Sequence, residues 1–204
     1  MFDPSKFSGS ILFYMFHIAL LLMILAEVFI VIHTRPKYGE RGKINKRDKG
    51  TKWLLVINFC ICIYLSFFMV GNKGWDRLLN TKLPVLCSYA GVLLMLAGVV
   101  IRLWAVLTLK RAFTLSVQTS KEQHLITSGI YRKIRNPAYT GSICSLIGTA
   151  LGLRGLIALV LVVGFSMACY YARIVVEEEA LRKHFGNEFT EYEKRTYRLL
   201  PFIW

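Results

Sequence analysis

The chain has 204 residues, 55% of them hydrophobic and 13% aromatic, which is too apolar for an ordinary soluble domain. Its formal net charge is +14, from 26 Lys and Arg against 12 Asp and Glu. In a soluble protein this excess would indicate nucleic-acid binding, but here the basic regions adjoin apolar runs, where they fix topology and meet anionic headgroups. We therefore expect a protein that is integral to the bilayer and binds no nucleic acid.

Three apolar runs in the first half are long enough to cross a hydrocarbon core of about 30 Å. They extend over residues 9–32, 53–70 and 83–109. The first contains Glu27 and the third contains Arg102. Because each lies near a helix end, each could snorkel to the membrane surface or line the path of a lipophilic acceptor.

Two shorter apolar runs follow, over residues 139–153 and 155–171, and the sequence G-L-R-G separates them. This pattern predicts two antiparallel helices joined by a tight turn. Pro137 precedes the first helix, where its missing N–H costs nothing. Beyond the second, the chain is charged but keeps a helical pattern, until Gly186 and Asn187 predict a helix stop and a new helix start.

These elements predict an all-α polytopic membrane protein with about five transmembrane helices, a C-terminal helical hairpin and cytosolic helices. Five spans place the most basic regions on one side, so the positive-inside rule puts the N-terminus outside and the C-terminus in the cytosol. The five cysteines lie in apolar runs and no histidines have metal-ligand spacing, so we expect neither disulfides nor a metal site. We divide the chain into residues 1–110, with three spans and a basic loop, and residues 111–204.

Two charged segments, residues 118–141 and 173–186, flank the predicted hairpin. Because a hairpin leads out and back, their near ends should lie within about 10 Å at the cytosolic face. Arg173 and Glu177 are four residues apart and therefore share one helix face. An Arg in this position could hold an anionic acceptor through a bidentate contact.

The residues of these segments suit a methyl donor with a sulfonium centre. Such a donor is already activated, so it needs positioning more than catalysis, through partners for an ammonium, a carboxylate, a ribose and a purine. Glu177 and Glu178 supply carboxylates, the loop around Gly129 supplies backbone groups, and Tyr131 and Tyr139 supply rings with hydroxyls. The sequence thus predicts a donor pocket formed by both segments.

Four motifs occur in order between residues 113 and 204: L-I-T-S-G-I-Y, R-N-P-A-Y-T-G, R-I-V-V-E-E-E and F-G-N-E-F-T-E-Y. In order and spacing they resemble the isoprenylcysteine carboxyl methyltransferase family, whose members are polytopic membrane enzymes that use S-adenosylmethionine. The resemblance implies methyl transfer to a lipophilic acceptor that arrives laterally between helices. A prenylated cysteine carboxylate is the family's acceptor, and phospholipid amines, thiols and other lipids are alternatives.

Carried over residue by residue, the resemblance makes Arg173, facing the acceptor, and Glu177 the catalytic residues. Two positions depart from the family pattern. Asn136 replaces a His, and an Asn exchanges hydrogen bonds but does not titrate near neutrality. A second family His falls at Gln123, with His124 next to it. The donor contacts implied are Gln118, Gln123, His124, Leu125, Ile126, Tyr131, Asn136, Pro137, Ala138, Tyr139 and Glu177, to which the chemistry above adds Gly129 and Glu178.

Two other functions fit the same pattern. One is a membrane sterol or lipid reductase that uses NADPH, because such enzymes have a similar C-terminal region; its cofactor phosphates would favour added Arg and Lys in the pocket. The other is a non-catalytic membrane protein on the same scaffold, for which Asn136 is the hint. Binding of S-adenosylhomocysteine against NADPH discriminates among the three.

Overall fold

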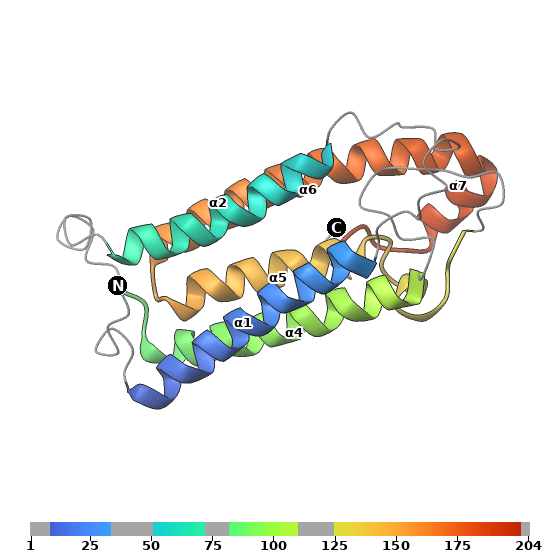
Figure 1. Cartoon of the computed structure of the whole chain (residues 1–204). Coiled ribbons are helices and arrows are strands. Elements are labelled where there is room, and N and C mark those ends of the chain that lie inside the picture. Colours follow the sequence, from blue (N-terminus) through green and yellow to red (C-terminus); the bar gives the residue numbers. More distant parts are fainter. Residues whose placement is uncertain (1–8, 34–50, 72–81, 110–124, 201–204) are drawn as a thin grey trace.

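The structure, a computed structural model, describes residues 9–33, 51–71, 82–109 and 125–200 (Figure 1). This part of the chain forms six α-helices and a short 3₁₀ helix, and it contains no β-strand. The all-α prediction is confirmed. The elements in chain order are α1 (Ser10–His33), α2 (Thr51–Gly71), α4 (Val85–Leu109), η3 (Gly129–Arg132), α5 (Pro137–Gly152), α6 (Leu156–Phe185) and α7 (Asn187–Lys194).

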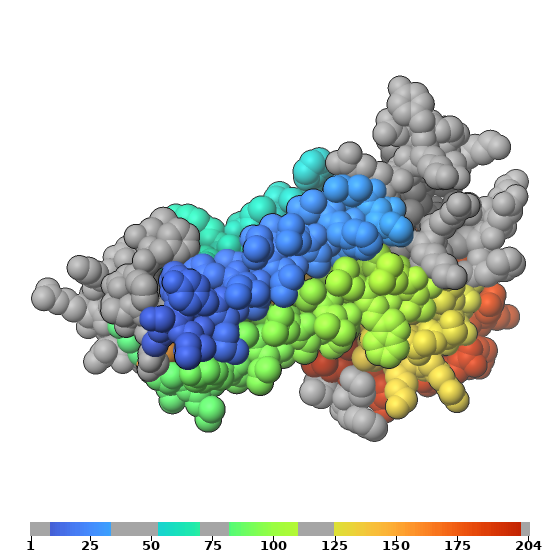
Figure 2. Space-filling view, turned by 60° about the horizontal axis from the view of Figure 1, so that its bottom comes forward, coloured from blue at the N-terminus to red at the C-terminus, as the bar shows by residue number. Residues whose placement is uncertain are grey.

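The long helices pack in two layers. In one layer α4 packs against both α1 and α5, and in the other α2 lies along α6 (Figure 1). Helix α5 contacts α6 and α2 as well as α4, so it joins the layers. Figure 2 shows the stretch around η3, in yellow, and C-terminal residues, in red, gathered at one end of the molecule. The layers therefore extend from a purely helical middle to an end where loops and short helices collect.

Helices α5 and α6 form the predicted hairpin, with residues 153–155 as its turn. Arg154 has a φ of 63°, in the left-handed region, and its guanidinium donates to the carbonyl of Leu83 at 2.6 Å. The turn is thereby tied to the start of α4. Helix α6 then continues for 30 residues to Phe185, so the apolar run and the charged segment after it are one rigid rod that ends at Gly186, where φ is 55°.

Small residues bring α4 and α5 into backbone contact. A Cβ atom added to Gly98 would lie 2.5 Å from the carbonyl oxygen of Gly141, and one added to Gly148 would lie 2.6 Å from the carbonyl oxygen of Gly91. Close approach through small residues is the usual way that helices associate in lipid, where burial of apolar side chains supplies no driving force. This contact fixes α5, and hence its first turn, against α4.

By length and composition, three helices in the described ranges can cross a membrane, namely α1, α4 and α6. The apolar part of α2, Trp53–Met69, is shorter, and α5 has 16 residues. Large apolar side chains such as Ile11, Leu93 and Val160 point outward, as expected of surfaces solvated by lipid. The chain is an integral membrane protein, and the count of five spans stays a prediction.

Glu27 and Arg102 form an ion pair between α1 and α4 that the sequence did not reveal. Arg102 is buried; its Nη2 donates to Glu27 Oε2 at 2.7 Å and its Nη1 donates to the carbonyl of Ala138 at 3.2 Å. Snorkelling to the membrane surface is therefore the wrong interpretation for Arg102, because its guanidinium turns into the bundle. The pair joins α1 and α4 to the first turn of α5.

Candidate functional site

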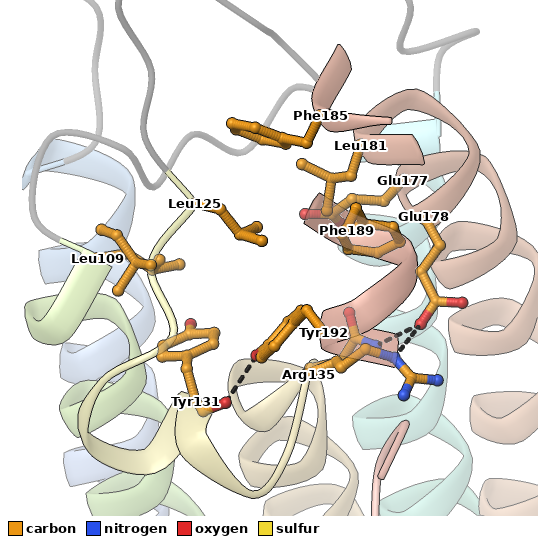
Figure 3. Close-up of a pocket in the computed structure, with 12 residues that line it drawn as sticks. Leu109, Leu125, Tyr131, Arg135, Glu177, Glu178, Leu181, Phe185, Phe189 and Tyr192 are labelled. Atoms are coloured by element: carbon orange, nitrogen blue, oxygen red, sulfur yellow. Dashed lines mark hydrogen bonds and ion pairs between the residues drawn. The ribbon is translucent and has the colours of Figure 1, made fainter. Parts of the chain in front are cut away.

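A small pocket, partly open to solvent, lies where α6 and α7 meet the end of α4 and the loop before η3 (Figure 3). One part of its wall is apolar and the other part is polar. The apolar residues are Leu109, Leu125, Ile126, Leu181, Phe185 and Phe189. The polar residues are Tyr131, Arg135, Asn136, Glu177, Glu178 and Tyr192.

The pocket collects residues of both charged segments that the sequence singled out. Those that line it are Leu125, Ile126, Tyr131, Asn136, Glu177 and Glu178. Others belong to the same elements but are not part of its lining: Gly129, Pro137, Ala138, Tyr139 and Arg173. Gln118, Gln123 and His124 lie outside the described residues. The hairpin thus brings residues 125–141 and 173–186 together.

Tyr139 lies between the two residues predicted to be catalytic. Its hydroxyl donates a hydrogen bond to Glu177 Oε2 and accepts one from Arg173 Nε at 3.1 Å. Arg173 Nε is also 3.6 Å from Glu177 Oε2, and the two side chains are 1% and 31% exposed. A buried guanidinium needs a counter-charge. Glu177 supplies it while leaving part of its carboxylate open to the pocket.

Tyr131 is held in the wall by η3. Gly129 begins this helix with a φ of 61°, a conformation that glycine adopts without a Cβ penalty. The Tyr131 hydroxyl points to the carbonyl of Ala105 at 3.4 Å, which ties η3 to α4. Burial, and next the negative charge of Glu177, raise the pKa of Tyr131 above its ordinary value. The phenol is therefore a neutral hydrogen-bond donor at physiological pH.

Glu178 faces another way than Glu177, as adjacent helix residues do, being about 100° apart. Its carboxylate, 4% exposed, is 3.1 Å from Arg135 Nε and 2.9 Å from Arg198 Nη2. Asn136 Nδ2 also donates to Glu178 Oε1, at 3.2 Å. In Figure 3 the Glu178 carboxylate lies beside Arg135, away from the open space. Glu178 and Asn136 were both predicted to contact a methyl donor. In the structure the Glu178 carboxylate and the Asn136 side-chain amide bond to protein groups.

Helix α7 also contributes to the site, although none of its residues was predicted to do so. Phe189 and Tyr192 are buried and line the pocket, and the Tyr192 hydroxyl donates to the carbonyl of Tyr131 at 2.7 Å. The signal was present in the motif F-G-N-E-F-T-E-Y, since two aromatic residues three apart on a short helix share one face. In the parts of the chain that the structure describes, no group of His, Cys, Asp and Glu has a metal-binding arrangement.

Comparisons with known proteins agree with this picture. The sequence model of the phospholipid methyltransferase family matches residues 86–188. A probable protein-S-isoprenylcysteine O-methyltransferase of Oryza sativa subsp. japonica is 38% identical over 178 residues, covering 85% of this chain and 93% of that protein. The protein-S-isoprenylcysteine O-methyltransferase of Saccharomyces cerevisiae is 32% identical over 197 residues, covering 94% of this chain and 80% of that protein. The similarity therefore extends into the N-terminal helices.

A solved structure has the same fold. It is that of a eukaryotic intramembrane Ras methyltransferase, an isoprenylcysteine carboxyl methyltransferase, and it matches with a TM-score of 0.65 and 22% identity. The match covers 97% of this chain and 70% of that chain. The helical arrangement described above is thus shared by a known membrane enzyme.

Proposed function

The chain belongs to the family of protein-S-isoprenylcysteine O-methyltransferases, and we propose that it transfers a methyl group from S-adenosylmethionine to the carboxylate of a prenylated cysteine. It is a membrane methyltransferase, and its similarity to methyltransferases along most of its length favours this activity over the NADPH-dependent reductase. The observation that carries the proposal is the Arg173, Tyr139 and Glu177 group, which presents a partly open carboxylate to the pocket.

The pocket suits the proposed donor. The open side of the Glu177 carboxylate can accept the ammonium group, and Phe185, Phe189 and Leu109 offer apolar surface for the purine. Leu125 and Ile126 bring a stretch of non-helical backbone to the opposite wall. When bound, the donor supplies an activated methyl group on a sulfonium centre, so these side chains need only hold it in line with the acceptor.

The acceptor side of the site follows from Arg173 and Tyr139. A carboxylate already carries the electron pair that attacks the methyl group, so the reaction needs no general base. Arg173 can hold one carboxylate oxygen by its guanidinium, and Tyr139 can donate to it, if the acceptor takes over part of the contact now made by Glu177. The two residues would fix the attacking oxygen while the prenyl chain stays among apolar helices.

The proposed topology places this site at the cytosolic face. Helices α1, α4 and α6 are long and apolar enough to cross the membrane. We assign these three helices together with α2 and α5 as the five spans, with the N-terminus outside and the C-terminus in the cytosol. Residues 1–110 would form the three N-terminal spans, and residues 111–204 would bind the donor. A lipophilic acceptor would then enter sideways from the bilayer.

The test uses the full chain in nanodiscs. We expect S-adenosylhomocysteine, and not NADPH, to bind in a titration, and Glu177→Gln to weaken this binding at least about tenfold, which corresponds to about 1.4 kcal/mol. Glu179→Gln is the matched control, since Glu179 is exposed and pairs with Lys183 on the surface of the same helix. Binding of NADPH instead would indicate the reductase, and binding of neither would indicate a non-catalytic protein.

The acceptor is tested with labelled S-adenosylmethionine and an N-acetylated farnesylcysteine that has a free carboxylate. Mild base should release the transferred label as methanol, because a methyl ester hydrolyses whereas a methylated amine or thiol does not. The same compound with its carboxylate converted to an amide should accept no label. Base-stable label in extracted lipids would move the acceptor to a phospholipid amine and would contradict the carboxylate proposal.

A further inference from the structure

The two neighbouring glutamates of α6 serve different parts of the molecule. Glu177 contacts Tyr139 and Arg173, whereas the buried carboxylate of Glu178 accepts hydrogen bonds from Arg135 and Arg198. Arg135 precedes α5 by two residues, and Arg198 lies near the C-terminal end of the described chain. One carboxylate on α6 thus connects the residues just before α5 with the residues that follow α7.

Residues 187–200, called the C-terminal segment below, comprise α7 and the non-helical residues that follow it. The non-helical part of this segment runs beside residues 133–136. Arg135 N donates to the carbonyl of Tyr197 at 2.8 Å, Tyr197 N donates to the carbonyl of Lys133 at 2.9 Å, and Asn136 N donates to the carbonyl of Arg198 at 3.2 Å. The C-terminal segment is therefore joined to the chain just before α5 by main-chain hydrogen bonds.

The same segment forms a wall of the pocket. Phe189 and Tyr192 are buried in that wall, and the Tyr192 hydroxyl holds the carbonyl of Tyr131 on the opposite side. Arg135 strengthens the arrangement, because its Nη1 donates to the carbonyls of Glu193 and Thr196 while its Nε bonds Glu178. The position of the wall thus depends on how Arg135 and Arg198 are held.

Charge explains why a carboxylate is needed between them. Arg135 and Arg198 both approach the one carboxylate of Glu178, with side chains that are 10% and 26% exposed. Without it, two partly buried guanidinium groups would lose the negative charge that they share, which is unfavourable. Asn136 adds a donor to the same carboxylate without adding a third positive charge.

We infer that Glu178 is a positioning residue. Its carboxylate holds Arg135 and Arg198 and thereby fixes the C-terminal segment as the pocket wall, so it controls the affinity for the methyl donor without touching the reacting atoms. The inference rests on the proposed function for the identity of the donor. It separates the roles of two adjacent carboxylates: Glu177 contacts the ligand, and Glu178 shapes the pocket around it.

The experiment compares Glu178→Gln with the wild type in nanodiscs. We expect the Kd for S-adenosylhomocysteine to rise at least about tenfold, with kcat at saturating donor and KM for the farnesylcysteine acceptor within about twofold of the wild type. Arg198→Gln, which leaves Arg135 paired, should raise the Kd in the same direction by a smaller factor. Arg182→Gln is the control, since it breaks a pair at the surface between α6 and Glu193 of the C-terminal segment, and it should leave the Kd within about twofold.

Hydrogen exchange gives a readout that does not depend on the reaction. In Glu178→Gln the amides of Arg135 and Tyr197 should exchange faster, whereas amides in the middle of α6 should not change. A Kd equal to that of the wild type would overturn the inference, whether or not kcat falls. If the wild type binds no S-adenosylhomocysteine, the proposed function fails, while the exchange result still decides whether Glu178 holds the C-terminal segment.

Discussion

The middle of the bundle and the end that carries the pocket are held together in opposite ways. In the middle, α4 and α5 touch through backbone because Gly91, Gly98, Gly141 and Gly148 have no side chains to separate them. At the other end, Glu178 and its neighbours hold the C-terminal segment through charged side chains. In lipid, helices gain no hydrophobic free energy from packing, so their association depends on close contact. Charged side chains near water can be either solvated or paired.

The largest effect should come from filling the glycine contact. Gly148→Leu places a side chain where a Cβ alone would be 2.6 Å from the main chain of α4, and we expect a loss of about 3 kcal/mol or more of folding free energy. The measurement is the yield of monodisperse protein and its unfolding midpoint in detergent. Gly164→Leu on α6 is the control, since nothing lies within 4 Å of its added Cβ. Equal behaviour of the two variants would show that the α4 contact is not tight.

A smaller effect is expected from breaking the ion pair between Glu27 and Arg102. This pair lies in the helical middle, where packing otherwise depends on close contact between helices. Arg102→Met leaves the Glu27 carboxylate without its partner, which should destabilise the protein by about 3 kcal/mol. The double variant Glu27→Met with Arg102→Met should regain most of that loss, because two apolar side chains need no pairing. Unfolding of both single variants and the double variant gives the coupling free energy. Additive losses would mean that the pair does not stabilise the bundle.

The smallest effect is a pH dependence at the end that carries the pocket. Burial raises the pKa of Tyr192 to about 12, although Arg135 and Arg195 oppose the shift. Since the folded pKa lies above the unfolded one, this stabilisation is complete below about pH 10 and is lost as pH rises toward about 12, with about 1 kcal/mol gone at pH 11. Unfolding of the wild type and of Tyr192→Phe, each at pH 8 and pH 11, isolates the contribution. An equal pH effect in both would contradict it.

Much of the fold could be predicted because helix limits are local. Pro137 begins α5, Gly186 ends α6, and the third apolar run, predicted over residues 83–109, is α4. The continuity of α6 was also indicated, because the charged part after the apolar run keeps a helical pattern. Nothing between Tyr171 and Arg173 breaks a helix, so the rod runs through.

The order and spacing of the motifs along the chain identified the family without any coordinates, and they singled out the two segments that meet at the pocket. Tertiary structure alone decided which way each side chain faces. Glu177 and Glu178 are the same residue type at adjacent positions. The Glu177 side chain is partly exposed at the pocket, whereas Glu178 binds Arg135 and Arg198. Likewise, Arg102 meets Glu27 only because α1 packs on α4. Partners distant in sequence are chosen by the rotation and packing of whole helices, which no local pattern records.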